Sequence, residues 1–310
     1  MLPVVLLIGP TASGKSAAAL DIAEKFNAEI VSVDSALVYR HMNIGTAKPS
    51  AEELARAPHH LIDLIDPTER YSAARFITDC LRAIHDIHAR GRLPLLVGGT
   101  MMYADALLRG MSDVPPTDPS IRAEIAARRE RDGVAALHAE LAKVDPITAA
   151  RLPVNDMQRI ERALEVWLMT GVPLSAQQGQ RKPALAGIQY TTILWQPEDR
   201  AWLHARCELR LNTMFASGFV DEVRALCARF SLHADLASMR CVGYRQVLDV
   251  LEGRAPEAEL FDRSLFATRQ LAKRQLTWMR GMSGETIACD EHDALDKVFN
   301  IVSKTIHMSS

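Results

Sequence analysis

The segment that most constrains this chain is Gly9–Ser16, whose letters GPTASGKS fit the pattern G-x-x-x-x-G-K-[ST]. The apolar run Val4–Ile8 before it predicts a buried strand, and Ala17–Phe26 after it is typical of a helix. A phosphate-binding loop requires this strand–loop–helix context. Glycines let the backbone approach a ligand closely, successive amides form an anion nest, and the helix N-terminus adds positive potential. The sequence therefore predicts a ligand that carries phosphate groups.

The whole loop is predicted to bind those phosphates. Lys15 supplies a positive charge, and the hydroxyl of Ser16 offers a ligand to Mg²⁺, which is the cofactor we expect. The pattern is also found in proteins that bind ATP and other nucleotides, so it does not by itself identify the ligand. The predicted phosphate-binding residues are Gly9, Pro10, Thr11, Ala12, Ser13, Gly14, Lys15 and Ser16.

Two further predicted strands end in residues that suit group transfer. Glu29–Val33 is followed by the carboxylate Asp34, and Leu93–Val97 runs into Gly98, Gly99 and Thr100. Many P-loop NTPases place a magnesium-binding carboxylate after the second of these strands, and none stands there. Ligands of open parallel sheets bind outside the carboxyl ends of the strands, so Asp34, Thr100 and the phosphate loop should border one crevice.

The order of predicted elements indicates an α/β fold. Residues 1–113 alternate strand and helix patterns, which predicts a P-loop core made of a parallel sheet with helices on both faces. Consecutive prolines at 115 and 116 break this alternation, and residues 120–170 read as helices only, followed by a polar loop over residues 171–182. We therefore expect an all-helical insertion domain over residues 114–185. Residues 186–310 should complete the core, with strands near Tyr190–Trp195 and Glu285–Cys289.

Bulk properties exclude some classes of protein. The net charge of the 310 residues is −2, so any contact with nucleic acid must come from local patches. No run approaches the roughly 20 apolar residues of a membrane span, and the five cysteines show no paired spacing. We expect no membrane contact, a cytoplasmic location and a monomer.

Motifs along nearly the whole chain resemble those of bacterial tRNA dimethylallyltransferases. They appear in the order of that family, and they depart from its commonest pattern at Ser16, where Thr is frequent, and at Ala36, where Gln is frequent. The matching segments are residues 9–16, 34–40, 44–49, 98–100, 116–119, 155–164, 240–246 and 273–278.

The resemblance implies a reaction and its partners. A dimethylallyl group would pass from dimethylallyl diphosphate to the exocyclic amine of adenosine 37, which lies 3′ of the anticodon in tRNA. Asp34 would act as the general base and Thr100 would orient the amine. From the residues alone, each of the two also suits a helix N-cap. Arg210 would be able to reach the diphosphate, although no spacing demands it.

The resemblance also implies contacts with tRNA. On a helix, Arg269, Lys273 and Arg280 project within about 40° of one another, with Trp278 nearby to stack on a base; a solvated face and a core tryptophan are the alternative. The implied tRNA-binding residues are Asp34, Ser35, Ala36, Leu37, Thr100, Arg122, Gln158, Arg159, Ile160, Glu161, Arg162, Arg240, Cys241, Val242, Gly243, Tyr244, Arg245, Lys273, Arg274, Gln275, Leu276, Thr277, Trp278, Met279 and Arg280.

Other functions remain open from the residues. An adenylate dimethylallyltransferase would use the same phosphate cradle on a free nucleotide, but it would not need an insertion domain. In a small-molecule kinase Lys15 would bind ATP and Asp34 would activate a hydroxyl group. An RNA-binding module without chemistry would leave Asp34 with no catalytic role.

Overall fold

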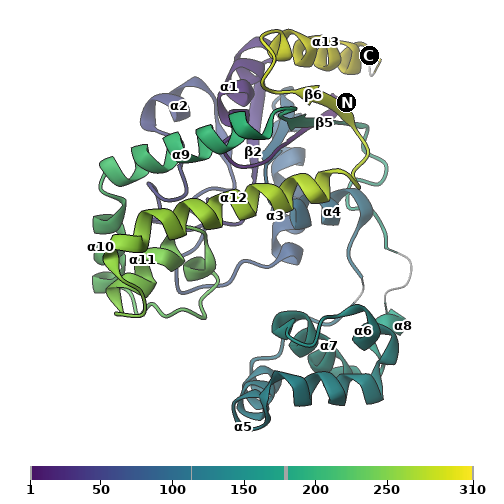
Figure 1. Cartoon of the computed structure of the whole chain (residues 1–310). Helices are drawn as coiled ribbons and strands as arrows, with labels where there is room; N and C mark the ends of the chain where they lie inside the picture. Colours follow the sequence, from purple (N-terminus) through teal and green to yellow (C-terminus); the bar gives the residue numbers. More distant parts are fainter. Residues whose placement is uncertain (1, 113, 178–180, 309–310) are drawn as a thin grey trace. The chain divides into compact units, whose positions relative to one another are not determined.

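The computed structural model describes residues 2–112, 114–177 and 181–308 (Figure 1). It divides into two compact units, a core made of residues 1–108 and 184–310 and a helical unit made of residues 109–183. No helix in the described part of the chain is long and apolar enough to span a membrane.

The core is built on one sheet in which every described strand pairs in parallel. The strand order is β3-β2-β4-β1-β5-β6. The register sets Val5 opposite Leu95 and Thr191, which places β1 in the middle of the sheet. The strands are β1 (Val4–Ile8), β2 (Ala28–Val33), β3 (His59–His60), β4 (Leu93–Gly98), β5 (Tyr190–Gln196) and β6 (Glu285–Ala288).

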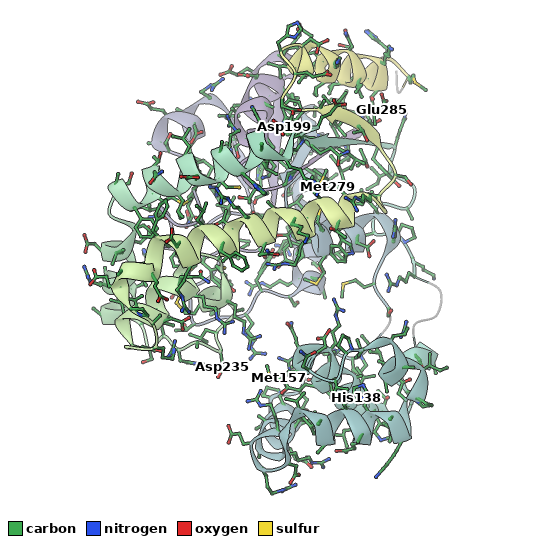
Figure 2. All side chains as sticks on the ribbon, in the orientation of Figure 1. His138, Met157, Asp199, Asp235, Met279 and Glu285 are labelled. Atoms are coloured by element: carbon green, nitrogen blue, oxygen red, sulfur yellow. The ribbon has the colours of Figure 1, made fainter. Side chains whose placement is uncertain are left out.

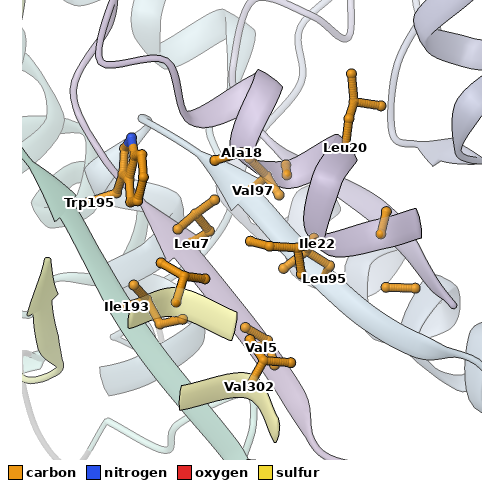
Figure 3. Packing of buried hydrophobic residues seen from close by; sticks show 14 of the residues in the cluster. Val5, Leu7, Ala18, Leu20, Ile22, Leu95, Val97, Ile193, Trp195 and Val302 are labelled. Carbon is orange, nitrogen blue, oxygen red and sulfur yellow. The ribbon is translucent and has the colours of Figure 1, made fainter. Parts of the chain in front are cut away.

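Helices cover both faces of the sheet, and the alternation of side chains along β1 explains why. Val5 and Leu7 point to one face and pack with α1 and α13, as Figure 3 shows for Val5, Leu7 and Val302. Leu6 and Ile8 point to the other face and pack with α3 and α4. These helices are α1 (Lys15–Phe26), α3 (Ala73–Ala89), α4 (Met101–Arg109) and α13 (Ala294–His307). The predicted α/β fold is confirmed.

The remaining core helices follow β2 and β5. A third apolar cluster joins α10 and α11 to the segment after β2, through Phe219 and Val247 on the helices and Val38 and Met42 on that segment. These elements are α2 (Ala51–Arg56), α9 (Arg200–Ala216), α10 (Phe219–Arg229), α11 (Tyr244–Leu251), α12 (Leu260–Met279) and the 3₁₀ turns η1 (Ser238–Arg240) and η2 (Glu257–Glu259).

The helical unit has an apolar core of its own. Leu137 and Leu141 of α5 pack against Ile160 and Leu164 of α7. His138, labelled in Figure 2, donates from Nε2 to the carbonyls of Ala149 and Leu152, at 3.1 Å each. The helices are α5 (Pro119–Val144), α6 (Pro146–Arg151), α7 (Met157–Thr170) and α8 (Leu174–Gln177); α5 is interrupted at Gly133, whose φ is 82°.

The boundaries of this unit differ from those that the sequence predicts. The unit comprises residues 109–183 rather than 114–185, because the chain leaves and re-enters the core beside Gly110 and Lys182. A Cβ atom on Gly110 would lie 2.1 Å from the carbonyl oxygen of Lys182, and φ of Gly110 is 82°. The short helix α8 falls within the polar loop predicted over residues 171–182. Residues 178–180 of that predicted loop lie outside the described part of the chain.

Candidate active site

The phosphate loop has the backbone of an anion nest. Ala12 and Gly14 adopt the left-handed conformation, with φ of 62° and 82°, and this alternation turns successive N–H groups toward one side. Gly14 is the N-cap of α1, so the helix begins at Lys15 and not at the predicted residue 17. The backbone therefore presents its amides at a helix N-terminus, where a phosphate is favoured.

Four hydrogen bonds hold three carbonyls of the loop away from that nest. The carbonyl of Pro10 accepts from the hydroxyl of Ser13, at 2.9 Å, and from Nζ of Lys15, at 3.0 Å. Arg206 Nε donates to the carbonyl of Ala12 at 2.8 Å, and Trp195 Nε1 donates to that of Ser13 at 2.9 Å. No hydrogen bond within the described ranges engages the N–H groups of residues 12–16, which leaves them as donors for a ligand.

Two residues of the predicted cradle have other partners. The N–H of Thr11 donates to Gln275 Oε1 at 2.9 Å, so it is not available to a diphosphate. Ser13 is 1% exposed and its hydroxyl is bound to Pro10, so its side chain supports the loop. The sequence could not show this, because Gln275 lies 264 residues away along the chain.

Two cations lie at the nest. Burial, followed by the charge of Arg210, lowers the pKa of Lys15 from 10.5 to about 8, against an opposite effect from Asp34 and Cys289. Burial likewise lowers the pKa of Arg210, while Asp34 raises it. Arg210 comes from α9, and among the described residues it donates one long bond, of 3.3 Å, to the carbonyl of Thr46. An anion placed here would therefore meet two charges that are poorly solvated.

Asp34 and Thr100 lie together at the ends of β2 and β4. Asp34 Oδ1 accepts from the N–H groups of Ala36, at 2.8 Å, and Leu37, at 3.4 Å, so it caps a turn and not the helix that the alternative reading required. Oδ2 of Asp34 has no hydrogen-bond partner among the described residues. Thr100 does not cap α4 with its side chain. Its hydroxyl accepts from the N–H of Ser35 at 2.9 Å and lies 3.2 Å from Ser35 Oγ.

A second loop, made of residues 43–46, borders this site, and no role was predicted for it from the sequence. The carboxylate of Glu222 accepts from the N–H groups of Asn43, Ile44 and Gly45, at 2.9, 2.7 and 3.3 Å, and from Tyr244 Oη at 2.5 Å. A Cβ atom on Gly45 would lie 2.1 Å from the ring of Phe219. The loop that carries Thr46, the partner of Arg210, is thus fixed from α10 and α11.

The residues present suit Mg²⁺ bound together with a diphosphate. The hydroxyl of Ser16 is exposed, and Oδ2 of Asp34 is unpaired within the described structure. In the parts of the chain described, no three His, Cys, Asp or Glu residues gather as a metal site. Mg²⁺ commonly takes one or two protein oxygens and completes its shell with water and phosphate oxygens. Ser16, the predicted ligand, fits that pattern.

The candidate RNA-binding helix α12 has two exposed flanks and a buried side. Arg269, Lys273 and Arg280 share the flank that faces α9. They line a groove of about 620 Å³ whose other residues are Arg200, Leu203, His204, Phe266, Gln270, Ala272, Leu276 and Thr277. Lys273 and Arg280 form no ion pair with a described residue, whereas Arg269 pairs with Glu208 at 2.9 Å.

The other flank of α12 carries Arg274 and Trp278. Trp278 is 50% exposed, and it does not line the basic groove. The prediction that it lies beside the basic stripe is wrong, because about 100° per residue separates it from Lys273 by about 140°. Gln275 and Met279 are on the buried side, at 8% and 1% exposure, and Figure 2 shows Met279 near the end of the helix. The prediction that the side chains of Gln275 and Met279 contact RNA is therefore wrong, because both are buried.

The segment 240–245 combines exposed cations with buried support. Arg240 and Arg245 are exposed, and Cys241 and Val242 are partly exposed. Tyr244 is fully buried, packs edge-on against Phe219 with ring centroids 5.0 Å apart, and bonds Glu222. Gly243 is also buried and has a φ of 92°. Tyr244 therefore supports this segment from the core and does not present its ring to RNA.

In the helical unit, the predicted RNA residues form an ion network around a buried carboxylate. Glu165 is 0% exposed and accepts from Arg162 at 2.7 Å and from the N–H of Asp118 at 2.9 Å, with Arg122 at 3.5 Å. Ile160 is in the apolar core, which excludes a side-chain contact with RNA.

Other predicted residues of this unit remain exposed or partly exposed. Gln158 and Arg159 are exposed, although Arg159 pairs with Asp156 at 3.3 Å. Glu161 pairs with Arg129 at 2.9 Å.

Fold and site together define the class of protein: a P-loop α/β enzyme of the group-transfer type, with a phosphate nest beside a carboxylate and a helical unit inserted in its core. The sequence matches the family described as IPP transferase over residues 37–282 and that described as isopentenyl transferase over residues 2–66. These two matches together extend over most of the chain.

Relatives of similar length share this description. The chain is 52% identical to the tRNA dimethylallyltransferase of Burkholderia thailandensis, over 98% of this chain and 95% of that protein. It is 55% identical to that of Methylibium petroleiphilum, over 98% of this chain and 95% of that protein.

Solved structures agree. The tRNA isopentenylpyrophosphate transferase of Bacillus halodurans is 34% identical, covers 99% of this chain and 98% of its own, and superposes with a TM-score of 0.71. A eukaryotic dimethylallyltransferase acting on tRNA is 26% identical, with coverage of 100% and 80% and a TM-score of 0.81. The chain belongs to the tRNA dimethylallyltransferase family.

Proposed function

We propose that this chain transfers the dimethylallyl group of dimethylallyl diphosphate to the exocyclic amine of adenosine 37 in tRNA. The observation that carries the proposal is the pairing of two groups at one edge of the sheet. A nest of unpaired amides with two cations suits a leaving diphosphate. Beside it, Asp34 offers an unpaired carboxylate oxygen to an acceptor. We further expect the enzyme to act as a monomer in the cytoplasm.

The donor half of the reaction uses the phosphate loop. The N–H groups of residues 12–16 bind the diphosphate oxygens, and Lys15 and Arg210 neutralise the charge that develops as the carbon–oxygen bond breaks. The hydroxyl of Ser16 would hold Mg²⁺, which would supply further charge stabilisation when bound. By analogy with the loss of one oxyanion donor, removal of Lys15 should cost about 3–4 kcal/mol of transition-state stabilisation.

The acceptor half uses Asp34. The amine of adenine is a weak nucleophile, because its lone pair is delocalised into the ring. As its nitrogen bonds to the allylic carbon, the amine proton passes to Oδ2 of Asp34, and the diphosphate leaves with the electron pair of the broken bond. Thr100 bonds the N–H of Ser35, so it fixes the turn that aims Asp34 and is a further polar group for the acceptor.

The cations of the core supply a surface for the RNA backbone. Lys273 and Arg280 lack acidic partners among the described residues, and the groove they line contains no carboxylate. Such cations gain most from phosphodiester contacts. Trp278 and Arg274, on the other flank, suit stacking on an unpaired base.

The test compares acceptors. The purified protein is incubated with Mg²⁺, labelled dimethylallyl diphosphate, and either an unmodified anticodon stem-loop with adenine at position 37, AMP or ATP. We expect label in the stem-loop and none when position 37 is guanine. Label in AMP or ATP instead would identify the free-nucleotide enzyme. No transfer to any acceptor, with phosphate released from ATP, would identify a kinase or NTPase.

A further inference from the structure

The side chain of Gln275 connects two loops of the active site by hydrogen bonds. It lies on the buried side of α12 with 8% of its surface exposed. Its Oε1 accepts from the N–H of Thr11 at 2.9 Å, and its Nε2 donates to the carbonyl of Gly99 at 2.8 Å. An N–H can only donate and a carbonyl can only accept, so these two partners fix the orientation of the side-chain amide.

The three segments are packed in direct contact at this point. A Cβ atom on Gly99 would lie 2.6 Å from Gln275 Nε2 and 3.0 Å from the carbonyl oxygen of Gly9. Residue 99 must therefore be glycine for the amide to reach both loops. On the sheet side, the N–H of Gly9 donates to the carbonyl of Gly98 at 3.1 Å, so the same two loops are joined twice.

We propose that Gln275 is a positioning residue for the transfer and not an RNA contact. It sets the separation between the phosphate loop, which holds the leaving diphosphate, and the turn that carries Thr100, next to Asp34. The inference rests on the proposed function, since it assigns the two loops to the donor and the acceptor of that reaction.

Loss of this amide has a specific consequence. In Gln275→Met, the partly buried N–H of Thr11 and the carbonyl of the buried Gly99 both lose their side-chain partner, and each loop is then free to shift toward another one. The amides of residues 12–16 remain supported, because Arg206 and Trp195 bind the loop carbonyls independently. Donor binding should therefore survive, while the alignment of the two reactants is lost. A misplacement of about 1 Å can cost about 10²-fold in rate.

The core offers a control residue of the same type for the experiment. Gln189 is exposed just before β5, and it lines neither the active site nor the basic groove. Gln275→Met and Gln189→Met are compared by three measurements: the single-turnover transfer rate at saturating donor and stem-loop, the affinity for inorganic diphosphate with Mg²⁺, and the affinity for the stem-loop. Gln275→Glu keeps the acceptor for Thr11 and loses the donor to Gly99.

We expect Gln275→Met to lower the single-turnover rate about 10²-fold and to change both affinities far less. Gln275→Glu should be slowed as well, and Gln189→Met should transfer at the wild-type rate. A loss of stem-loop affinity with an unchanged rate at saturation would make Gln275 an RNA contact and overturn the proposal. A wild-type rate in Gln275→Met would also overturn it.

Backbone hydrogen exchange separates this inference from the proposed function. Residues 9–13 should exchange faster in Gln275→Met than in the wild type or Gln189→Met, whether or not the wild type modifies RNA. Unchanged exchange over these residues would contradict the role of Gln275 even in an active enzyme. An inactive wild type with the expected change in exchange would contradict only the proposed function.

Discussion

Lys15 lies in an environment that disfavours its own charge. Burial and, to a smaller extent, the charge of Arg210 lower its pKa to about 8, with only partial compensation by Asp34 and Cys289. An incoming diphosphate reverses this balance, because it brings negative charge to both cations. The unliganded site therefore stores electrostatic repulsion that the donor relieves on binding.

The affinity for dimethylallyl diphosphate should consequently depend on pH. Below about pH 8 Lys15 is already protonated and binding takes up no proton at this residue. Above pH 8 the free enzyme has lost the proton that the complex requires, so affinity should fall by up to about tenfold per pH unit. Isothermal titration calorimetry between about pH 7 and 9, in buffers of different ionisation enthalpy, measures both effects.

Lys15→Arg is the control for this prediction, because its guanidinium stays charged over this pH range. Any pH dependence that comes from titration of the donor itself should appear equally in this variant and in the wild type. The affinity of the variant should be nearly constant over the same range. Equal pH dependence in Lys15→Arg and the wild type would contradict the assignment to Lys15.

Among the elements, α12 combines three roles through its three sides. Its buried side holds Gln275 against the phosphate loop, one flank lines the basic groove with Lys273 and Arg280, and the other presents Arg274 and Trp278. A single helix thus brings the cations proposed to bind RNA within two turns of a residue that contacts the phosphate loop.

The two flanks should contribute to tRNA binding in different ways. Replacing Lys273 and Arg280 by alanine should weaken binding to every RNA, and it should reduce the slope of log K against log salt by about 2. Trp278→Ala should cost about 1–3 kcal/mol without changing that slope. Binding isotherms at several salt concentrations measure both. An unchanged slope in the double variant would exclude the groove as a phosphate-binding surface.

The sequence predicted the strands and the phosphate loop well because their signals are local. The apolar run Val4–Ile8 and the pattern of Gly9–Ser16 each specify their own structure. The supports of the loop were missed, since Trp195, Arg206 and Gln275 come from distant segments that only the fold brings together. The displacement of Trp278 from the basic flank, in contrast, follows from helical spacing and was readable in the sequence.

At the scale of the molecule, the helical unit is an insertion whose ends meet. Leu107 and Ala184 are joined by a hydrogen bond of 2.9 Å from the N–H of Ala184 to the carbonyl of Leu107. The apolar clusters of the two units share no residue, and the phosphate loop, Asp34 and Arg210 all belong to the core. The residues proposed to bind the donor therefore all lie outside the helical unit.

Removal of residues 109–183, with a short glycine linker in their place, should leave a folded core. This variant should bind dimethylallyl diphosphate with wild-type affinity and should lose transfer to tRNA. Circular dichroism, calorimetry and the labelled transfer assay check the three statements. Full transfer activity in the shortened chain would show that the helical unit has no part in RNA modification.

The most direct test of the account is the single-turnover transfer rate of Asp34→Asn at saturating donor and tRNA stem-loop. Asparagine retains the oxygen that accepts from Ala36 and Leu37, so the turn is preserved, but it cannot take the proton of the amine. If Asp34 is the general base, we expect a rate about 10²–10⁴-fold below that of the wild type, with unchanged affinity for the donor. A rate equal to that of the wild type would contradict the assignment of Asp34 as the base, and with it the proposed arrangement of the two reactants.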